Sequence, residues 1–116
     1  MVTIRQPPED AVFRALADPS RREILRLLRH ERLTVGQIAA NFRASRPAIS
    51  KHLRLLRAAG LVVSHRDGTS NICGLNAKPL RTVHNWLQDY KEFWGQSLRQ
   101  LKHYIEEPEN QKEQTP

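Results

Sequence analysis

Residues 33–61 read LTVGQIAANFRASRPAISKHLRLLRAAGL, a pattern that predicts two short helices joined by a tight turn. Thr34 is a good N-cap for the first helix, and Gln37 stands three residues later, which is the spacing of a capping box. Ser45 is expected to cap the second helix. Gly60 is expected to end it, because glycine easily adopts the left-handed backbone conformation that closes many helices.

Each of these helices carries an apolar stripe. In the first helix, Ile38 and Phe42 lie four residues apart. In the second, Ile49, Leu53 and Leu56 follow at spacings of four and three residues. Such spacing gathers apolar side chains on one face of a helix, so both helices should pack against a core and expose their polar faces.

Positive charge is concentrated on the same stretch. The chain has 116 residues and a formal net charge of +7, and residues 43–66 contain six Arg or Lys and no Asp or Glu. A helix-turn-helix places its second helix in the DNA major groove. A solvated surface hairpin of helices would show the same spacing, but the concentrated charge favours a DNA interface. The expected DNA-binding residues are Arg43, Ser45, Arg46, Ser50, Lys51, Arg54, Arg57 and Arg66.

The DNA contacts are expected to be of two kinds. Arg46 lies near the start of the second helix, together with Ser45 and Ser50, where side chains reach base edges. Arg57 and Arg66 are better placed for the phosphate backbone. The pattern does not indicate whether Lys51 and Arg54, the two other cations of the second helix, contact bases or the phosphate backbone.

The residues after Gly60 change from helical to strand-like. Residues 61–65 are rich in β-forming side chains, residues 66–69 contain an Asp-Gly turn signal, and residues 70–75 form the returning strand. Arg66 should lie in this turn, where it either meets DNA or stays solvated. A helix-turn-helix followed by such a hairpin is a winged helix-turn-helix.

The rest of the chain completes a mainly α fold with a two-stranded β wing. Two helices should precede the central pair, the second beginning after the N-cap Asp18 and Pro19. One long helix should follow the wing, from Pro79 to about Glu107. Its apolar and aromatic stripe is large for one small core, which favours a second copy of the helix as its partner. A helix that folds back wholly on its own domain remains the alternative.

Composition limits the classes of function. Apolar residues make up 39% of the chain, which should form one domain over residues 1–106 and a disordered polar tail over 107–116. No apolar run approaches the roughly 20 residues of a membrane span, and no secretory signal opens the chain, so a cytoplasmic protein without a membrane partner is expected. The only cysteine, Cys73, is expected to be a small apolar strand residue or, as the alternative, a redox sensor. No nucleophile–base set or glycine-rich phosphate loop indicates an enzyme.

Two segments resemble the ArsR/SmtB-type winged-helix repressors. They are ALADPSRREIL at residues 15–25 and SKHLRLLRAAGLV at residues 50–62, and the Arg-Asp-Gly wing at 66–68 agrees with them. The resemblance implies a homodimeric repressor of a double-stranded DNA operator, with its first and last helices at the dimer interface. The interface residues expected on those helices are Val12, Phe13, Leu87, Tyr90, Trp94, Leu98 and Leu101.

The metal-sensing sites of that family are not matched. Thr34 and Gly36 stand where one site has cysteines, and neither supplies a soft thiolate. The positions of a second site hold Asn76, Lys78, Asp89 and Glu92, of which only the last is a plausible metal donor. The long aromatic last helix is most similar to the metal-independent autorepressors, so no metal or cofactor is expected. A small-molecule effector bound between the long C-terminal helices is the alternative.

Overall fold

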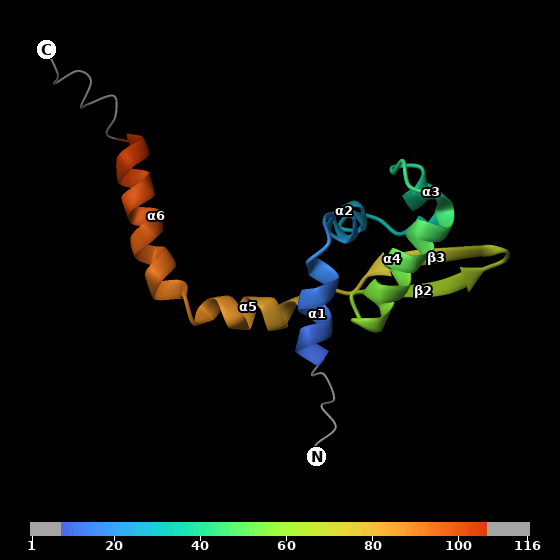
Figure 1. The fold of residues 1–116 in the computed structure, drawn as a ribbon, viewed down its shortest axis with the longest axis horizontal. Coiled ribbons are helices and arrows are strands. Elements are labelled where there is room, and N and C mark those ends of the chain that lie inside the picture. Colours follow the sequence, from blue (N-terminus) through green and yellow to red (C-terminus); the bar gives the residue numbers. More distant parts are fainter. Residues whose placement is uncertain (1–7, 107–116) are drawn as a thin grey trace, which may run out of the picture. The chain divides into compact units, whose positions relative to one another are not determined.

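The structure is a computed structural model in which residues 8–106 are described (Figure 1). The chain divides after Val83 into two compact units. The expected disordered tail at 107–116 lies outside the described residues. The first unit contains α1 (Pro8–Leu16), α2 (Pro19–Leu27), β1 (Leu33–Thr34), α3 (Val35–Ala39), α4 (Arg46–Ala58), β2 (Val62–Asp67) and β3 (Ser70–Leu75). The boundary falls within α5 (Leu80–Gln88), and α6 (Lys91–Glu106) belongs to the second unit.

The helix starts are the ones that the capping residues predicted. Asp18 caps α2, Thr34 caps α3 and Ser45 caps α4, each accepting a hydrogen bond from the backbone N–H three residues later. Thr34 and Gln37 form a complete capping box, with hydrogen bonds of 3.1 and 2.8 Å. These short-range bonds satisfy backbone donors that the first helical turn leaves unpaired.

The end of α4 is also confirmed. Gly60 has a φ of 77°, and its N–H donates to the carbonyl of Arg57 at 2.9 Å. The N–H of Leu61 donates to the carbonyl of Leu56 at 3.0 Å. This pair of bonds is a Schellman motif, which ends the helix and turns the chain into β2.

The prediction of a two-stranded wing was incomplete, because the sheet has a third strand. The strand order is β1-β3-β2, with both pairs antiparallel. In β1, Leu33 pairs with Cys73 and Thr34 pairs with Ile72. Sequence reasoning missed β1 because it has only two residues, the second of which is the N-cap of α3, and two residues are too few to show an alternating pattern.

The turn of the hairpin is shorter than predicted. Arg66 and Asp67 belong to β2, and Asp67 pairs with Ser70, so only Gly68 and Thr69 connect the strands. Gly68 has a φ of 65°, and no non-glycine residue in the described part of the chain has a positive φ. A positive φ at only the first of two turn residues is typical of a type II′ hairpin turn, whose twist matches that of the strands.

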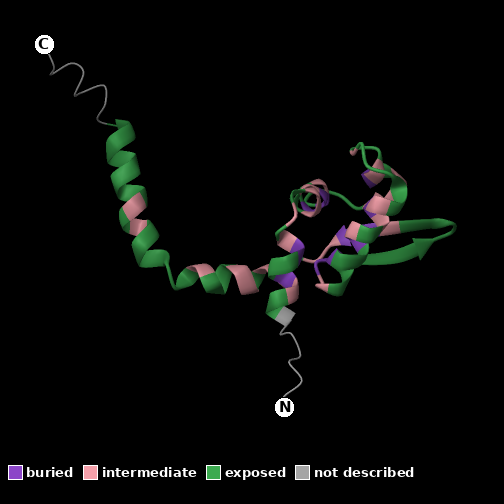
Figure 2. Ribbon diagram, viewed as in Figure 1, coloured by how far each residue is buried: buried purple, intermediate pink, exposed green. Residues whose placement is uncertain are grey.

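The core lies in the first unit and draws on every helix from α1 to α4 (Figure 2). Ile49, Leu53 and Leu56 are fully buried, as the stripe on the second helix predicted, and Ile38 of α3 is fully buried too. Phe42 is only partly buried at the edge of this core. The core residues are Val12, Ala15, Ile24, Leu25, Leu28, Ile38, Ile49, Leu53, Leu56, Leu61, Val62 and Cys73.

The predicted single C-terminal helix is wrong, because it is broken into α5 and α6. The N–H groups of Asp89 and Tyr90 bond carbonyls three residues back, at 3.3 and 3.0 Å, which is the tight geometry of a helix end. A new helical turn starts where the N–H of Trp94 donates to the carbonyl of Tyr90 at 2.9 Å. The apolar spacing of three and four continues across this break, so periodicity alone did not reveal it.

Candidate nucleic-acid interface

The recognition helix α4 exposes a polar face opposite its buried stripe. Ser50 is partly exposed on this helix, whereas the other predicted DNA-binding residues are exposed. Their side chains come from three segments: the turn before α4, α4 itself and strand β2. The exposed members are Arg43, Ser45, Arg46, Lys51, Arg54, Arg57 and Arg66.

The hairpin register determines which way Arg66 faces. Arg66 pairs with Asn71, and two residues further along the strands Ser64 pairs with Cys73. Directly paired residues share one face of a sheet, and so do residues two apart in a strand. Cys73 is fully buried, so this face is directed at the core, and Arg66 and Asn71 continue it toward the turn.

A polar groove, here called the wing groove, lies between α3, α4 and the start of β3. It has a volume of about 270 Å³ and is lined by Thr34, Val35, Gly36, Arg46, Ser50, Thr69, Ser70 and Asn71. The guanidinium of Arg46 lies over Gly36, with Nη2 3.8 Å from the position that a Cβ would occupy there. Sequence reasoning missed the three wing residues of this lining, because only strand register and tertiary packing place them beside α4.

Arg57 is held near the hairpin. Its Nη1 donates to Ser64 Oγ at 3.4 Å, and Ser64 Oγ is hydrogen-bonded to Cys73 Sγ at 3.5 Å. Arg57, which is expected to bind the DNA backbone, is therefore oriented by Ser64 of β2. Cys73 is enclosed in the core. The exposed guanidinium keeps further donors for a DNA phosphate.

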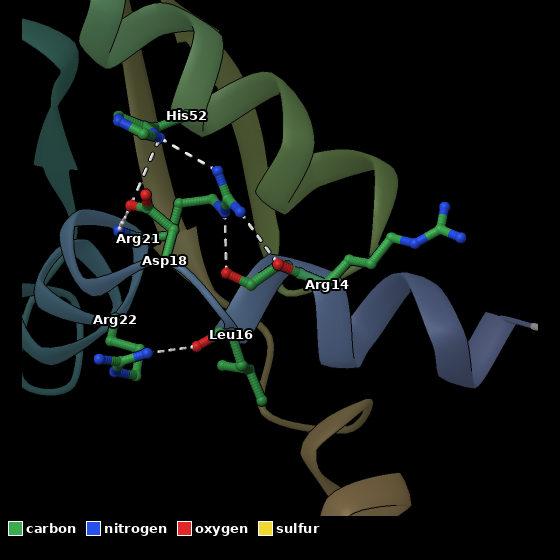
Figure 3. A network of polar contacts seen from close by, with 7 residues as sticks. Arg14, Leu16, Asp18, Arg21, Arg22 and His52 are labelled. Atoms are coloured by element: carbon green, nitrogen blue, oxygen red, sulfur yellow. Dashed lines mark hydrogen bonds and ion pairs between the residues drawn. The ribbon is translucent and has the colours of Figure 1, made fainter.

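A second network holds α4 against α1 and α2 (Figure 3). The Nε of Arg21 donates to the carbonyl of Ala15 at 2.8 Å, and its Nη2 donates to the carbonyl of Arg14 at 3.0 Å. These carbonyls lie in the last turn of α1, and the carbonyl of Arg14 also accepts from the backbone N–H of Ala17 at 3.2 Å. The Nη1 of Arg21 lies 3.3 Å from Nδ1 of His52 on α4. Because arginine can only donate, this contact is a hydrogen bond when Nδ1 of the imidazole carries no proton.

Asp18 completes this network. Its Oδ2 accepts from the backbone N–H of Arg21 at 3.0 Å and lies 3.9 Å from Nδ1 of His52. The hydrogen bond from the Arg21 backbone N–H lowers the pKa of Asp18 most, and burial of the carboxylate opposes this shift. The charge of Arg21, and that of His52 when its imidazole is protonated, lower the pKa further. Arg22 donates to the carbonyl of Leu16 at 2.7 Å. The polar side chains of residues 15–25, one of the two segments that resemble the ArsR/SmtB repressors, therefore join α1, α2 and the recognition helix.

The second unit carries an apolar surface. Four of its side chains are about half exposed in the single chain: Tyr90 (45%), Trp94 (46%), Leu98 (60%) and Leu101 (53%). The ring centroids of Trp86 and Tyr90 lie 5.1 Å apart.

Within residues 8–106, no helix combines the length and apolar content that crossing a bilayer requires.

The residues expected at a dimer interface differ in accessibility. Leu87 is partly exposed. On α1, Phe13 is 36% exposed, whereas Val12 is 2% exposed inside the core of the single chain and has almost no surface left for a partner.

At the mismatched metal positions, Asn76 has a structural contact: its Nδ2 donates to the carbonyl of Gly60 at 2.9 Å. Among the described side chains, no group of three or more His, Cys, Asp or Glu residues is arranged to hold a metal ion.

Comparison with known proteins identifies the family. Residues 18–64 match the family model described as bacterial regulatory protein, arsR family. The transcriptional repressor SdpR of Bacillus subtilis is 40% identical over 79 residues, which cover 68% of this chain and 88% of SdpR. The HTH-type transcriptional regulator Rv2034 of Mycobacterium tuberculosis is 38% identical over 98 residues, covering 84% of this chain and 87% of that protein.

The fold agrees with this assignment. The crystal structure of the ArsR family transcriptional regulator RHA00566 superposes with a TM-score of 0.71 at 31% identity, covering 77% of this chain and 98% of that one. An ArsR-like transcriptional regulator from Rhodococcus sp. RHA1 has a TM-score of 0.63 at 31% identity, with coverage of 84% and 92%. The chain therefore belongs to the ArsR family of bacterial regulatory proteins and is a DNA-binding transcriptional regulator.

Proposed function

We propose that the protein is a homodimeric repressor that occupies a DNA operator overlapping a promoter. The observation that carries the proposal is the exposed basic face of α4, which lies beside a hairpin whose Arg66 faces the same side as the groove-lining Asn71. Its DNA-binding residues are the same eight that the sequence predicted, from Arg43 to Arg66. Because operator DNA lies in the cytoplasm of a bacterium, the protein acts there.

The DNA-binding face is tested by removing one charge inside it and one outside it. Arg54→Ala removes an exposed cation of α4, and Arg29→Ala removes an exposed cation that follows α2. Fluorescence anisotropy should be measured on an operator duplex, selected by the protein from random sequences, and on a scrambled duplex. Arg54→Ala should weaken operator binding by about 1–3 kcal/mol if it contacts a base, or less if it contacts only phosphate. A larger loss for Arg29→Ala than for Arg54→Ala would place the DNA on another face.

Dimerisation is proposed through the apolar faces of α5 and α6. A small chain that leaves this many aromatic and aliphatic side chains exposed is expected to cover them with a second copy, because water is a poor solvent for such a patch. Val12 is left out of this interface because it is buried in its own subunit.

The dimer is tested by placing one negative charge on or off the apolar stripe. Trp94→Glu places a carboxylate among the stripe residues and should give a monomer by light scattering, since an unpaired buried charge is costly. Gln96→Glu adds the same charge about 200° around the helix, by the rotation of 100° per residue, and should leave the dimer intact. A monomer for the natural protein at micromolar concentration would refute the proposed dimer.

A further inference from the structure

The wing groove combines a cation with several neutral hydrogen-bonding side chains. Arg46 and Ser50 line it from α4, Thr34 from the start of α3, and Ser70 and Asn71 from β3. No carboxylate is among its lining residues. A guanidinium next to hydroxyl and amide groups is a lining that suits a phosphate oxygen better than an apolar ligand.

The position of the groove in the fold points to the same ligand. When a recognition helix lies in the major groove, the first helix of the pair crosses the DNA backbone. A hairpin that reaches the neighbouring minor groove has a backbone strand between itself and the recognition helix, because a backbone strand separates the two grooves. The wing groove lies between these elements, since α3, α4 and β3 all contribute to its walls.

We propose that the wing groove seats one phosphodiester of the operator backbone. Arg46 supplies the charge from one wall, and the amide of Asn71 donates from the opposite wall. This inference rests on the proposed DNA-binding function and changes one expected role: Arg46, whose guanidinium lies over Gly36 at the groove wall, binds the backbone instead of reading a base.

Asn71 provides the sharper test because it was not among the residues expected to bind DNA. Asn71→Asp is nearly isosteric and places a carboxylate where the phosphate would sit. His65→Asp is the matched control, because His65 is exposed on the same hairpin and lies one residue before Arg66, on the opposite face. Asn71→Asp should weaken binding to the operator and to a scrambled duplex at least tenfold more than His65→Asp does. Equal losses for the two variants would overturn the proposal.

Two further measurements test whether Arg46 and Asn71 contact a phosphate: the salt dependence of binding, and binding to DNA in which single phosphates are replaced by uncharged methylphosphonates. Arg46→Ala should lower the slope of log affinity against log salt concentration by about 0.9 per subunit, whereas Asn71→Ala should leave the slope unchanged because the amide carries no charge. A set of operator duplexes, each with one methylphosphonate at a different position, should reveal one phosphate per half-site whose neutralisation lowers the DNA affinity of the natural protein. The same replacement should leave the affinity of Arg46→Ala and of Asn71→Ala unchanged.

The outcomes separate the phosphate seat from the proposed function. If Asn71→Ala or Arg46→Ala changes the preference for one base pair and shows no altered response to any neutral phosphate, the groove reads bases and the phosphate seat is refuted. If the natural protein binds the operator no more tightly than the scrambled duplex, the proposed operator-binding function fails, whereas equal losses for Asn71→Asp and His65→Asp refute the phosphate seat alone. Circular dichroism of each variant confirms that its fold is intact.

Discussion

Arg21 is predicted to be the polar side chain on which the position of α4 depends most. Its guanidinium donates to two carbonyls at the end of α1 and to His52 on α4, at 2.8, 3.0 and 3.3 Å. A hydrogen bond from a charged group contributes about 1.5–3 kcal/mol when it is buried. Two of these three bonds are partly buried and one is exposed, and the freed carbonyls regain water after a truncation. We therefore expect Arg21→Ala to lower the free energy of unfolding by about 2–3 kcal/mol.

The assay is urea unfolding followed by circular dichroism. Protein concentration must be held constant, because association of subunits would add its own concentration-dependent stability. A loss of about 2–3 kcal/mol should also lower the melting temperature by about 10 °C for a chain of this size. Arg22→Ala is the matched control, because the neighbouring arginine makes a single exposed bond to the carbonyl of Leu16, and it should cost about 1 kcal/mol or less.

The contact with α4 is isolated by a double-mutant cycle. His52→Ala should destabilise the natural protein more than it destabilises the Arg21→Ala variant, with a coupling free energy of about 0.5–1 kcal/mol. Additive effects would show that the 3.3 Å contact contributes nothing. If Arg21→Ala costs no more than Arg22→Ala, the reasoning that Arg21 joins α1 to α4 is refuted.

Three further predictions follow from single sites. Because the pKa of Asp18 is lowered from its ordinary 3.8, its stabilising effect is complete above that value and is lost as pH falls through the lowered folded-state pKa; Asp18→Asn should therefore flatten the acid limb of a plot of melting temperature against pH. Gly60→Ala should cost about 1–2 kcal/mol in urea unfolding, because alanine is strained at a φ of 77°, and an unchanged midpoint would contradict the capping role. Zinc, cadmium or arsenite should leave operator affinity unchanged in anisotropy titrations, because Thr34 and Gly36 offer no thiolate; a tenfold drop reversed by chelator would show a metal site.

The amino-acid sequence by itself determined the local structure around the recognition helix. Thr34 and Ser45 cap their helices with bonds that span three residues, and Gly60 closes α4 with bonds to the turn before it. Interactions of this range depend on residue types a few positions apart, so reading the chain in order is enough to find them. The buried stripe of α4 was predictable for the same reason, since a regular helix converts spacing directly into a face.

Only the tertiary structure decided what depends on residues distant in the chain. The strand β1 exists because β3, which is distant in the sequence, offers its free edge to it, with Leu33 opposite Cys73. Arg21 contacts His52, 31 positions away, and Asn71 lines the same groove as Arg46. The break between α5 and α6 is local and was hidden for a different reason, because the apolar spacing continues through it unchanged. Such contacts form between surfaces that the folded chain brings together, and neither the spacing nor the type of neighbouring residues records which surfaces those will be.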